Sequence, residues 1–188
     1  MHDLIPLTAL GGSAPQIDTI GSTTIAEQPG IALASVAARF GNEKAAAETL
    51  SKFVNARPPE PGKATLSSPI SMVWMAQDQW MLFADYQTHE TFADELRSAL
   101  GQDASVTEQS DAWVCFDLRG ESVIDMCERL CAAPVRRMQT ADAQRTTVHH
   151  LGCFIICLEA GQEIRFMGPR SSAGSLHHAL ISAARSVA

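Results

Sequence analysis

The alternation of apolar and polar residues is clearest between residues 110 and 130. From residue 112 to 118 every second side chain is apolar, which is typical of a strand with one buried face. After Gly120 the apolar side chains recur at the spacing of one helical face, at Val123, Met126, Cys127 and Leu130. The pattern predicts a buried strand, a glycine turn and an amphipathic helix.

The same succession occurs earlier, between residues 31 and 54, with a turn at Gly41 and Asn42 as the expected helix N-cap. In each half a strand hairpin and a second helix follow. We expect these at residues 70–84 and 88–100 in the first half, and at 145–167 and 171–185 in the second. Residues 103–109 are polar and short, and we expect them to link the halves. The recurrence indicates an internal duplication, although chance is the alternative because strand–helix–hairpin–helix is a common order.

The predicted fold class is α+β. It consists of two ferredoxin-like strand–helix–hairpin–helix halves, residues 31–102 and 103–188, related by a pseudo-two-fold. Apolar residues occur on both faces of the hairpin at 70–84, so its sheet is expected to be buried on both sides. With a linker this short, the halves are expected to form one domain over residues 31–188.

Residues 1–30 are predicted to form an extended N-terminal arm. From residue 11 onward this segment is rich in Gly, Ser, Thr and Pro and holds no Lys or Arg. It also carries Ile17, Ile20 and Ile25, which a purely solvated arm would not need. Two alternatives stay open: the arm orders against a partner chain on assembly, or it packs on its own domain.

Composition and charge narrow the class of protein. The 188 residues are 46% apolar, and 21 acidic against 14 basic residues give a net charge of −7. That charge argues against nucleic acid as a partner, because phosphate binding needs a clustered positive face. The sequence has no recognisable signal peptide or membrane-spanning stretch, so no membrane contact is expected. The five cysteines are an odd number, and we interpret them as reduced thiols in a cytoplasmic protein.

The cysteines and histidines together include the ligand types that zinc prefers, but their spacing differs from that of zinc sites. The chain has no Cys-x-x-Cys pair and no histidines at i and i+4. The cysteines lie in apolar elements, which favours buried structural thiols over metal ligands or a Cys–His nucleophile. The chain also lacks a G-x-G-x-x-G sequence after a strand, so no flavin or nicotinamide site of its own is expected.

One weak anion-binding candidate remains, at the start of the last helix. Arg170, Ser171 and Ser172 follow a Gly-Pro pair, and they would combine a guanidinium, hydroxyls and helix-start N–H groups. The alternative is an ordinary N-cap beside a surface arginine. No catalytic residue and no metal ligand is predicted.

The order of short motifs in the second half resembles the gamma subunit of heterotetrameric sarcosine oxidase. That family is similar in turn to the folate-binding domain of the glycine-cleavage T-protein and its YgfZ-like relatives. The shared pattern is a Ser-Asp strand, a Gly turn opening a helix, an Arg-Thr strand and an Arg-Ser-x-Ala helix start. In this chain the four motifs are Ser110-Asp111, Gly120, Arg145-Thr146 and Arg170-Ser171-Ser172-Ala173, and the resemblance extends over roughly residues 30 to 186.

The resemblance implies a non-catalytic subunit of an enzyme complex. In that family the oxidase demethylates sarcosine with oxygen as electron acceptor, yielding glycine, hydrogen peroxide and formaldehyde or methylenetetrahydrofolate. The alpha and beta subunits hold FAD, FMN, NAD and tetrahydrofolate, and a small delta subunit carries zinc. The implied partners are therefore alpha, beta and delta subunits, and no cofactor is expected on this chain.

Two other functions remain open at this point. One is a stand-alone tetrahydrofolate-binding or aminomethyltransferase-like protein, which the T-protein resemblance would also allow. A folate tail would require basic side chains around a cleft, and Arg145 and Arg170 are the obvious candidates. The other is a soluble α+β domain of unrelated use.

Overall fold

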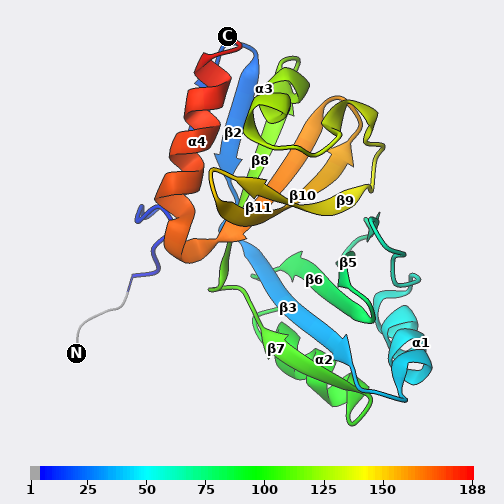
Figure 1. Cartoon of the computed structure of the whole chain (residues 1–188). Helices are drawn as coiled ribbons and strands as arrows, with labels where there is room; N and C mark the ends of the chain where they lie inside the picture. Colours follow the sequence, from blue (N-terminus) through cyan, green and yellow to red (C-terminus); the bar gives the residue numbers. More distant parts are fainter. Residues whose placement is uncertain (1–4) are drawn as a thin grey trace. The chain divides into compact units, whose positions relative to one another are not determined.

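The computed structural model describes residues 5–188, which form two compact units (Figure 1). Unit 1 combines the N-terminal segment up to Pro29 with Ala112–Thr140 and Arg145–Ala188. Unit 2 consists of Gly30–Asp111 and Ala141–Gln144. Each unit has its own sheet, its own pair of helices and its own apolar core.

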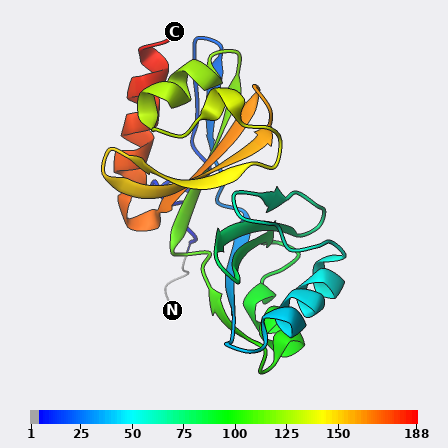
Figure 2. The same cartoon turned by 45° about the vertical axis from the view of Figure 1, so that its right-hand side comes forward.

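Unit 2 contains a five-stranded sheet in the order β4-β5-β6-β3-β7. In chain order the elements are β3 (Ile31–Ala38), α1 (Glu43–Val54), β4 (Ala64–Thr65), β5 (Ser71–Ala76), β6 (Gln79–Asp85), α2 (Phe92–Leu100) and β7 (Ala104–Glu108). Helices α1 and α2 pack together on one face of the sheet (Figure 2). Leu50 and Leu96 from the helices meet Val36 and Leu82 from the strands in this core, and all four are fully buried.

Unit 1 contains a six-stranded sheet in the order β1-β2-β8-β11-β10-β9. Its elements are β1 (Ile17–Ile20), β2 (Thr23–Glu27), β8 (Trp113–Gly120), α3 (Val123–Leu130), the 3-10 turn η1 (Val135–Arg137), β9 (Ala143–Val148), β10 (Leu151–Glu159), β11 (Glu163–Pro169), the 3-10 turn η2 (Arg170–Ser172) and α4 (Ala173–Arg185). Helices α3 and α4 contact each other and cover one face of the sheet. Phe116 and Phe166, fully buried on neighbouring strands, lie at the centre of this core.

The two sheets share one strand order, which supports the predicted duplication. The series β9-β10-β11-β8-β2 in unit 1 corresponds to β4-β5-β6-β3-β7 in unit 2. The strand that directly precedes each repeat in the chain, however, pairs with the first strand of the other repeat. β2 precedes β3 in the chain but pairs with β8, and β7 precedes β8 but pairs with β3. The leading strands of the two halves are therefore exchanged.

The polar stretch at residues 103–109, predicted as a linker, is mostly strand. Residues 104–108 form β7, which pairs antiparallel with β3 from Ala34↔Glu108 to Ala38↔Ala104. The prediction missed this strand because an edge strand with one solvated face carries few apolar side chains.

The N-terminal segment also differs from a free arm, although its first four positions lie outside the described residues. β2 pairs with β8 of the same chain, and Ile25 is 1% exposed in the core of unit 1. Of the two alternatives for this segment, the structure shows packing on its own chain. The isoleucines that made a solvated arm implausible are explained in part by this burial.

The helices begin close to where the pattern places them, with one clear difference. α2 starts at Phe92 with Thr91 at the N-cap, and not at Thr88. The Thr88 hydroxyl instead donates to the carbonyl oxygen of Asp85 at 3.2 Å, inside the turn after β6. The α+β class with two helix-covered antiparallel sheets is confirmed. Within residues 5–188, no helix combines the length and the apolar character that crossing a membrane requires.

Candidate functional site

The three anion-site candidates lie together at the junction between β11 and α4. Arg170, Ser171 and Ser172 form η2, and Ser172 occupies the N-cap of α4 without a side-chain capping hydrogen bond. The Arg170 side chain does not stand free, because its Nη2 donates to the carbonyl oxygen of Leu7 at 2.9 Å. This arginine therefore ties down the N-terminal segment, a role that the sequence did not suggest.

Two further side chains hold the same segment. Glu27, at the end of β2, is 2% exposed and accepts hydrogen bonds from the backbone N–H of Leu10 at 3.0 Å and of Gln16 at 3.1 Å. His177 on α4 contacts Asp18 on β1, with Nε2 and Oδ2 2.8 Å apart. The segment from Leu7 to β1 is thus fixed to unit 1 at several separate points.

The cysteines are distributed as buried structural thiols. Cys115, Cys127, Cys153 and Cys157 are at most 3% exposed, and Cys131 is partly exposed. Burial raises the pKa of Cys115 to about 12 and that of Cys153 to about 11, and it raises the pKa of Cys127 as well. A thiol with such a pKa stays protonated near neutral pH and is a poor nucleophile.

The histidine pairs are not gathered into a metal centre. His149 and His150 form the exposed two-residue turn between β9 and β10, both with positive φ. His178 is exposed on α4, whereas His177 packs against Phe116 with 5.7 Å between the ring centroids. Across residues 5–188, no three His, Cys, Asp or Glu side chains converge in a way that could hold a metal ion.

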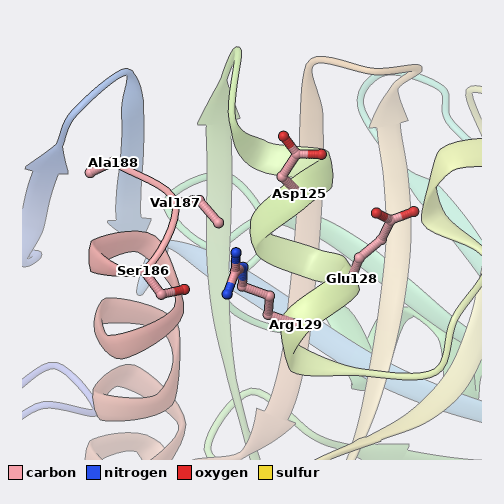
Figure 3. Close-up of a pocket in the computed structure, with 6 residues that line it drawn as sticks. All are labelled: Asp125, Glu128, Arg129, Ser186, Val187 and Ala188. Atoms are coloured by element: carbon pink, nitrogen blue, oxygen red, sulfur yellow. The ribbon is translucent and has the colours of Figure 1, made fainter.

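A polar cleft of about 590 Å³ lies between α3 and the residues that follow α4. Its lining residues are Asp125, Glu128, Arg129, Ser186, Val187 and Ala188 (Figure 3). Figure 3 shows Arg129 reaching from α3 toward the end of α4. A second arginine, Arg136, binds the two acids of this lining, Asp125 and Glu128, and its Nη2 lies 2.7 Å from a carboxylate oxygen of each. The hydrogen bond from Arg136 holds the pKa of Glu128 below the usual range. The cleft is therefore lined by acids already neutralised by an arginine, an arrangement that provides no evident nucleophile or general base.

Several large apolar side chains are exposed instead. In unit 1 these are Ile5, Leu7 and Ile17, and in unit 2 they are Phe40, Leu66 and Tyr86. Phe40, in the connection from β3 to α1, has the largest exposure, at 102% of the reference value. Isolated exposed apolar residues are common on protein surfaces, but an exposed aromatic ring is a frequent anchor in protein–protein contacts. The described residues thus offer better candidates for assembly than for chemistry.

Comparison with known proteins supports the fold assignment. No family model and no curated protein sequence matches the chain. Among solved structures, a chain of the heterotetrameric sarcosine oxidase from Corynebacterium sp. U-96 is similar with a TM-score of 0.77 and 20% identity, over 88% of this chain and 85% of that one. The glycine cleavage system aminomethyltransferase T from Bartonella henselae is similar with a TM-score of 0.65 and 16% identity, over 89% of this chain.

These likenesses establish the fold. The chain has the fold that the sarcosine oxidase chain shares with part of the aminomethyltransferase, as its second-half motifs predicted. The alignment covers 47% of the aminomethyltransferase, so this chain spans about half the length of that protein.

Proposed function

We propose that this chain is the gamma-type subunit of a heterotetrameric sarcosine oxidase. The observation that carries the proposal is the match in fold to a chain of that enzyme, with a TM-score of 0.77 over 88% of one chain and 85% of the other. The second-half motifs, from Ser110-Asp111 to Arg170-Ser171-Ser172-Ala173, support the same family on independent grounds.

In this proposal the chain is a non-catalytic subunit that helps to assemble the complex and takes no part in the reaction itself. Alpha and beta subunits would hold FAD, FMN, NAD and tetrahydrofolate, and a delta subunit would hold zinc. Together they would oxidise sarcosine to glycine, with hydrogen peroxide and formaldehyde or methylenetetrahydrofolate as further products. The high pKa of the buried thiols and the neutralised acids of the α3 cleft are consistent with a non-catalytic chain.

The second candidate is a stand-alone tetrahydrofolate-binding or aminomethyltransferase-like protein. The similarity to aminomethyltransferase T, with a TM-score of 0.65, favours it. Its two basic candidates differ in availability: Arg170 is bound to the Leu7 carbonyl oxygen, whereas Arg145 lies over the ring of Phe154, 5.9 Å from its centroid. A guanidinium on a buried aromatic ring could bind a carboxylate by donating hydrogen bonds to its oxygens, so a folate titration of the isolated chain is a meaningful test.

The deciding experiment is affinity purification of the tagged chain from its own cells, followed by native mass spectrometry, a visible absorbance spectrum and a sarcosine-dependent peroxide assay. We expect a yellow complex, much heavier than the 20.2 kDa chain, that produces peroxide from sarcosine. A colourless 20.2 kDa particle would contradict the subunit proposal. In that case, saturable tetrahydrofolate binding that is weakened by Arg145→Gln would support the second candidate.

A further inference from the structure

Phe40 is presented to solvent by a connection that is itself well anchored. The side chain is 102% exposed, compared with 71% for Ile5 and 64% for Ile17, the next largest values among exposed apolar residues in the described chain. An exposed phenyl ring on a mobile loop would need no special explanation. Here the backbone on both sides of it is fixed.

Hydrogen bonds to the α2–β7 turn hold both flanks of Phe40. The Arg39 backbone N–H donates to the carbonyl oxygen of Asp103 at 2.8 Å, and the Arg39 guanidinium donates to Oε1 of Gln102 at 2.8 Å. On the other side, the Asn42 side chain donates to the carbonyl oxygen of Gln102 at 3.4 Å, and its backbone N–H donates to the Arg39 carbonyl oxygen at 2.8 Å. The residues before and after the ring are thus tied to each other and to a neighbouring turn.

The turn itself is locked by its glycine and by the first acid of α1. Gly41 has a φ of +85°, a conformation that strains any residue with a Cβ. The Gly41 N–H donates to Oε1 of Glu43 at 2.9 Å. The backbone N–H of Glu43 itself and, to a smaller extent, that of Gly41 lower the pKa of this carboxyl. Little backbone freedom therefore remains to be lost when the Phe40 ring is buried, and preorganisation of this kind favours tight binding.

Resting on the function proposed above, we propose that Phe40 is an anchor that inserts into an apolar pocket of a larger subunit of the oxidase complex. Binding energy at protein interfaces is concentrated in a few aromatic or arginine side chains that fill pockets and are ringed by polar groups. Phe40 has this setting: Arg39 beside it and Lys44 on α1 are exposed, and the turn contributes backbone polar groups around the ring. The inference assigns a contact point on unit 2 that the fold likeness does not specify.

A protein pocket fits this surface better than a lipid bilayer or a second copy. Peripheral membrane binding by one aromatic side chain needs a surrounding basic patch. Arg39 and Lys44 do not form one, because Glu43 lies at the same turn and Lys44 pairs with Glu48 at 3.9 Å, and the chain as a whole carries a net charge of −7. A second copy would have to offer an apolar pocket. The cleft at α3 is lined mainly by charged and polar groups and does not offer such a pocket, and the oligomeric state measured below tests this occupant directly.

The test compares full-length wild type with Phe40→Ala, Phe40→Leu and Tyr86→Ala in assembly with the alpha, beta and delta subunits. Tyr86 is a matched control because it is an exposed aromatic residue of the same unit, at 44% exposure. We expect Phe40→Ala to weaken assembly by about 30-fold, Phe40→Leu to retain much of it, and Tyr86→Ala to leave it unchanged. The melting temperature of the isolated chain should be the same for Phe40→Ala and wild type, because the fully exposed ring does not pack against the rest of the chain.

The outcomes separate this inference from the function on which it rests. If wild type assembles and Phe40→Ala assembles equally well, the anchor is wrong and the subunit assignment stands. If wild type does not assemble with those subunits, the assignment itself is wrong. Sedimentation with anionic phosphatidylserine vesicles, or a concentration-dependent dimer in native mass spectra, would also overturn the proposed occupant if Phe40→Ala abolished it.

Discussion

Arg165 on β11 binds Asp117 on β8 through two parallel hydrogen bonds, Nε to Oδ1 at 2.6 Å and Nη2 to Oδ2 at 2.8 Å. The two residues are direct cross-strand partners, and their side chains are only 18% and 12% exposed. This bidentate pair lies on the sheet face opposite α3 and α4, because side chains alternate along β8 and Phe116 points into the helix-covered core.

Replacing Asp117 by Asn should therefore destabilise the chain by about 2–3 kcal/mol, because the mostly buried guanidinium of Arg165 loses its counter-charge. The control is Arg119→Gln on the same two strands. Arg119 pairs with Glu163 but is 68% exposed, so its loss should change stability little. Urea unfolding of both variants measures the difference, and equal costs would show that the Asp117–Arg165 pair is no more than a surface contact.

Removing the Glu27 carboxylate should loosen the N-terminal segment. Glu27→Ala leaves the N–H groups of Leu10 and Gln16 without their acceptor, at an expected cost of about 1–3 kcal/mol. Hydrogen exchange should accelerate at these two amides before it changes in β10 or β11. Glu90→Ala, at an exposed glutamate before α2, is the matched control and should leave both amides protected. Unchanged exchange in Glu27→Ala would contradict the anchoring role.

Gly120 is required for the close approach of β2 to β8. A Cβ at this position would lie 1.9 Å from the carbonyl oxygen of Ser22, and φ is +137°. Gly120→Ala should therefore cost at least about 3 kcal/mol, because the strand itself has to shift. Gly161→Ala provides the comparison, since φ there is +75° with open space around the new methyl group, and it should cost only about 1 kcal/mol. Similar melting temperatures for the two variants would refute the steric explanation.

The thiols should react in an order set by their exposure. At pH 8 a thiol with a pKa of about 12, such as Cys115, is ionised to roughly one part in ten thousand, and Cys153 with a pKa of about 11 to one part in a thousand. Iodoacetamide should accordingly label the partly exposed Cys131 first. Because both pKa values are raised, raising the pH to 9 should still leave the buried thiols unlabelled in the folded chain. Peptide mass spectrometry measures the sites, with Cys131→Ser as control; early labelling of Cys115 would be inconsistent with its burial.

The sequence predicted the elements whose periodicity comes from a single buried face. Val114, Phe116 and Leu118 on β8, and Val123 and Met126 on α3, are buried as their spacing indicated. β7 and β1 escaped prediction because both are edge strands, which gain their stability from backbone pairing with one neighbour and carry few buried apolar side chains. The neighbour of β7 is β3, in the first half of the chain, so no local pattern reports that pairing.

The candidate functional residues were harder to predict, for a related reason. The motif at Arg170 was visible, but its partner is the carbonyl oxygen of Leu7, 163 positions earlier, and no local pattern reports such a contact. Phe40 follows an apolar strand, so periodicity alone would place its side chain in the buried core or in the exposed turn equally well. Its exposure follows from the end of β3 at Ala38 and from the turn at Gly41, which are features of backbone geometry.

The exchange of leading strands between the two units has a consequence for synthesis on the ribosome. The strands of the five-stranded sheet all lie within Gly30–Asp111, so that sheet can close as soon as β7 has emerged. The six-stranded sheet cannot, because its first strands must wait for β8: Ser22 and Ser122, which bond through their hydroxyls, are 100 positions apart. Until β8 is made, β1 and β2 can pair with each other, but the edge of β2 that later pairs with β8 stays open. Open strand edges of this kind favour aggregation of nascent chains. β9, β10 and β11 are made later still, so the connectivity allows the five-stranded sheet to form before the six-stranded sheet is complete.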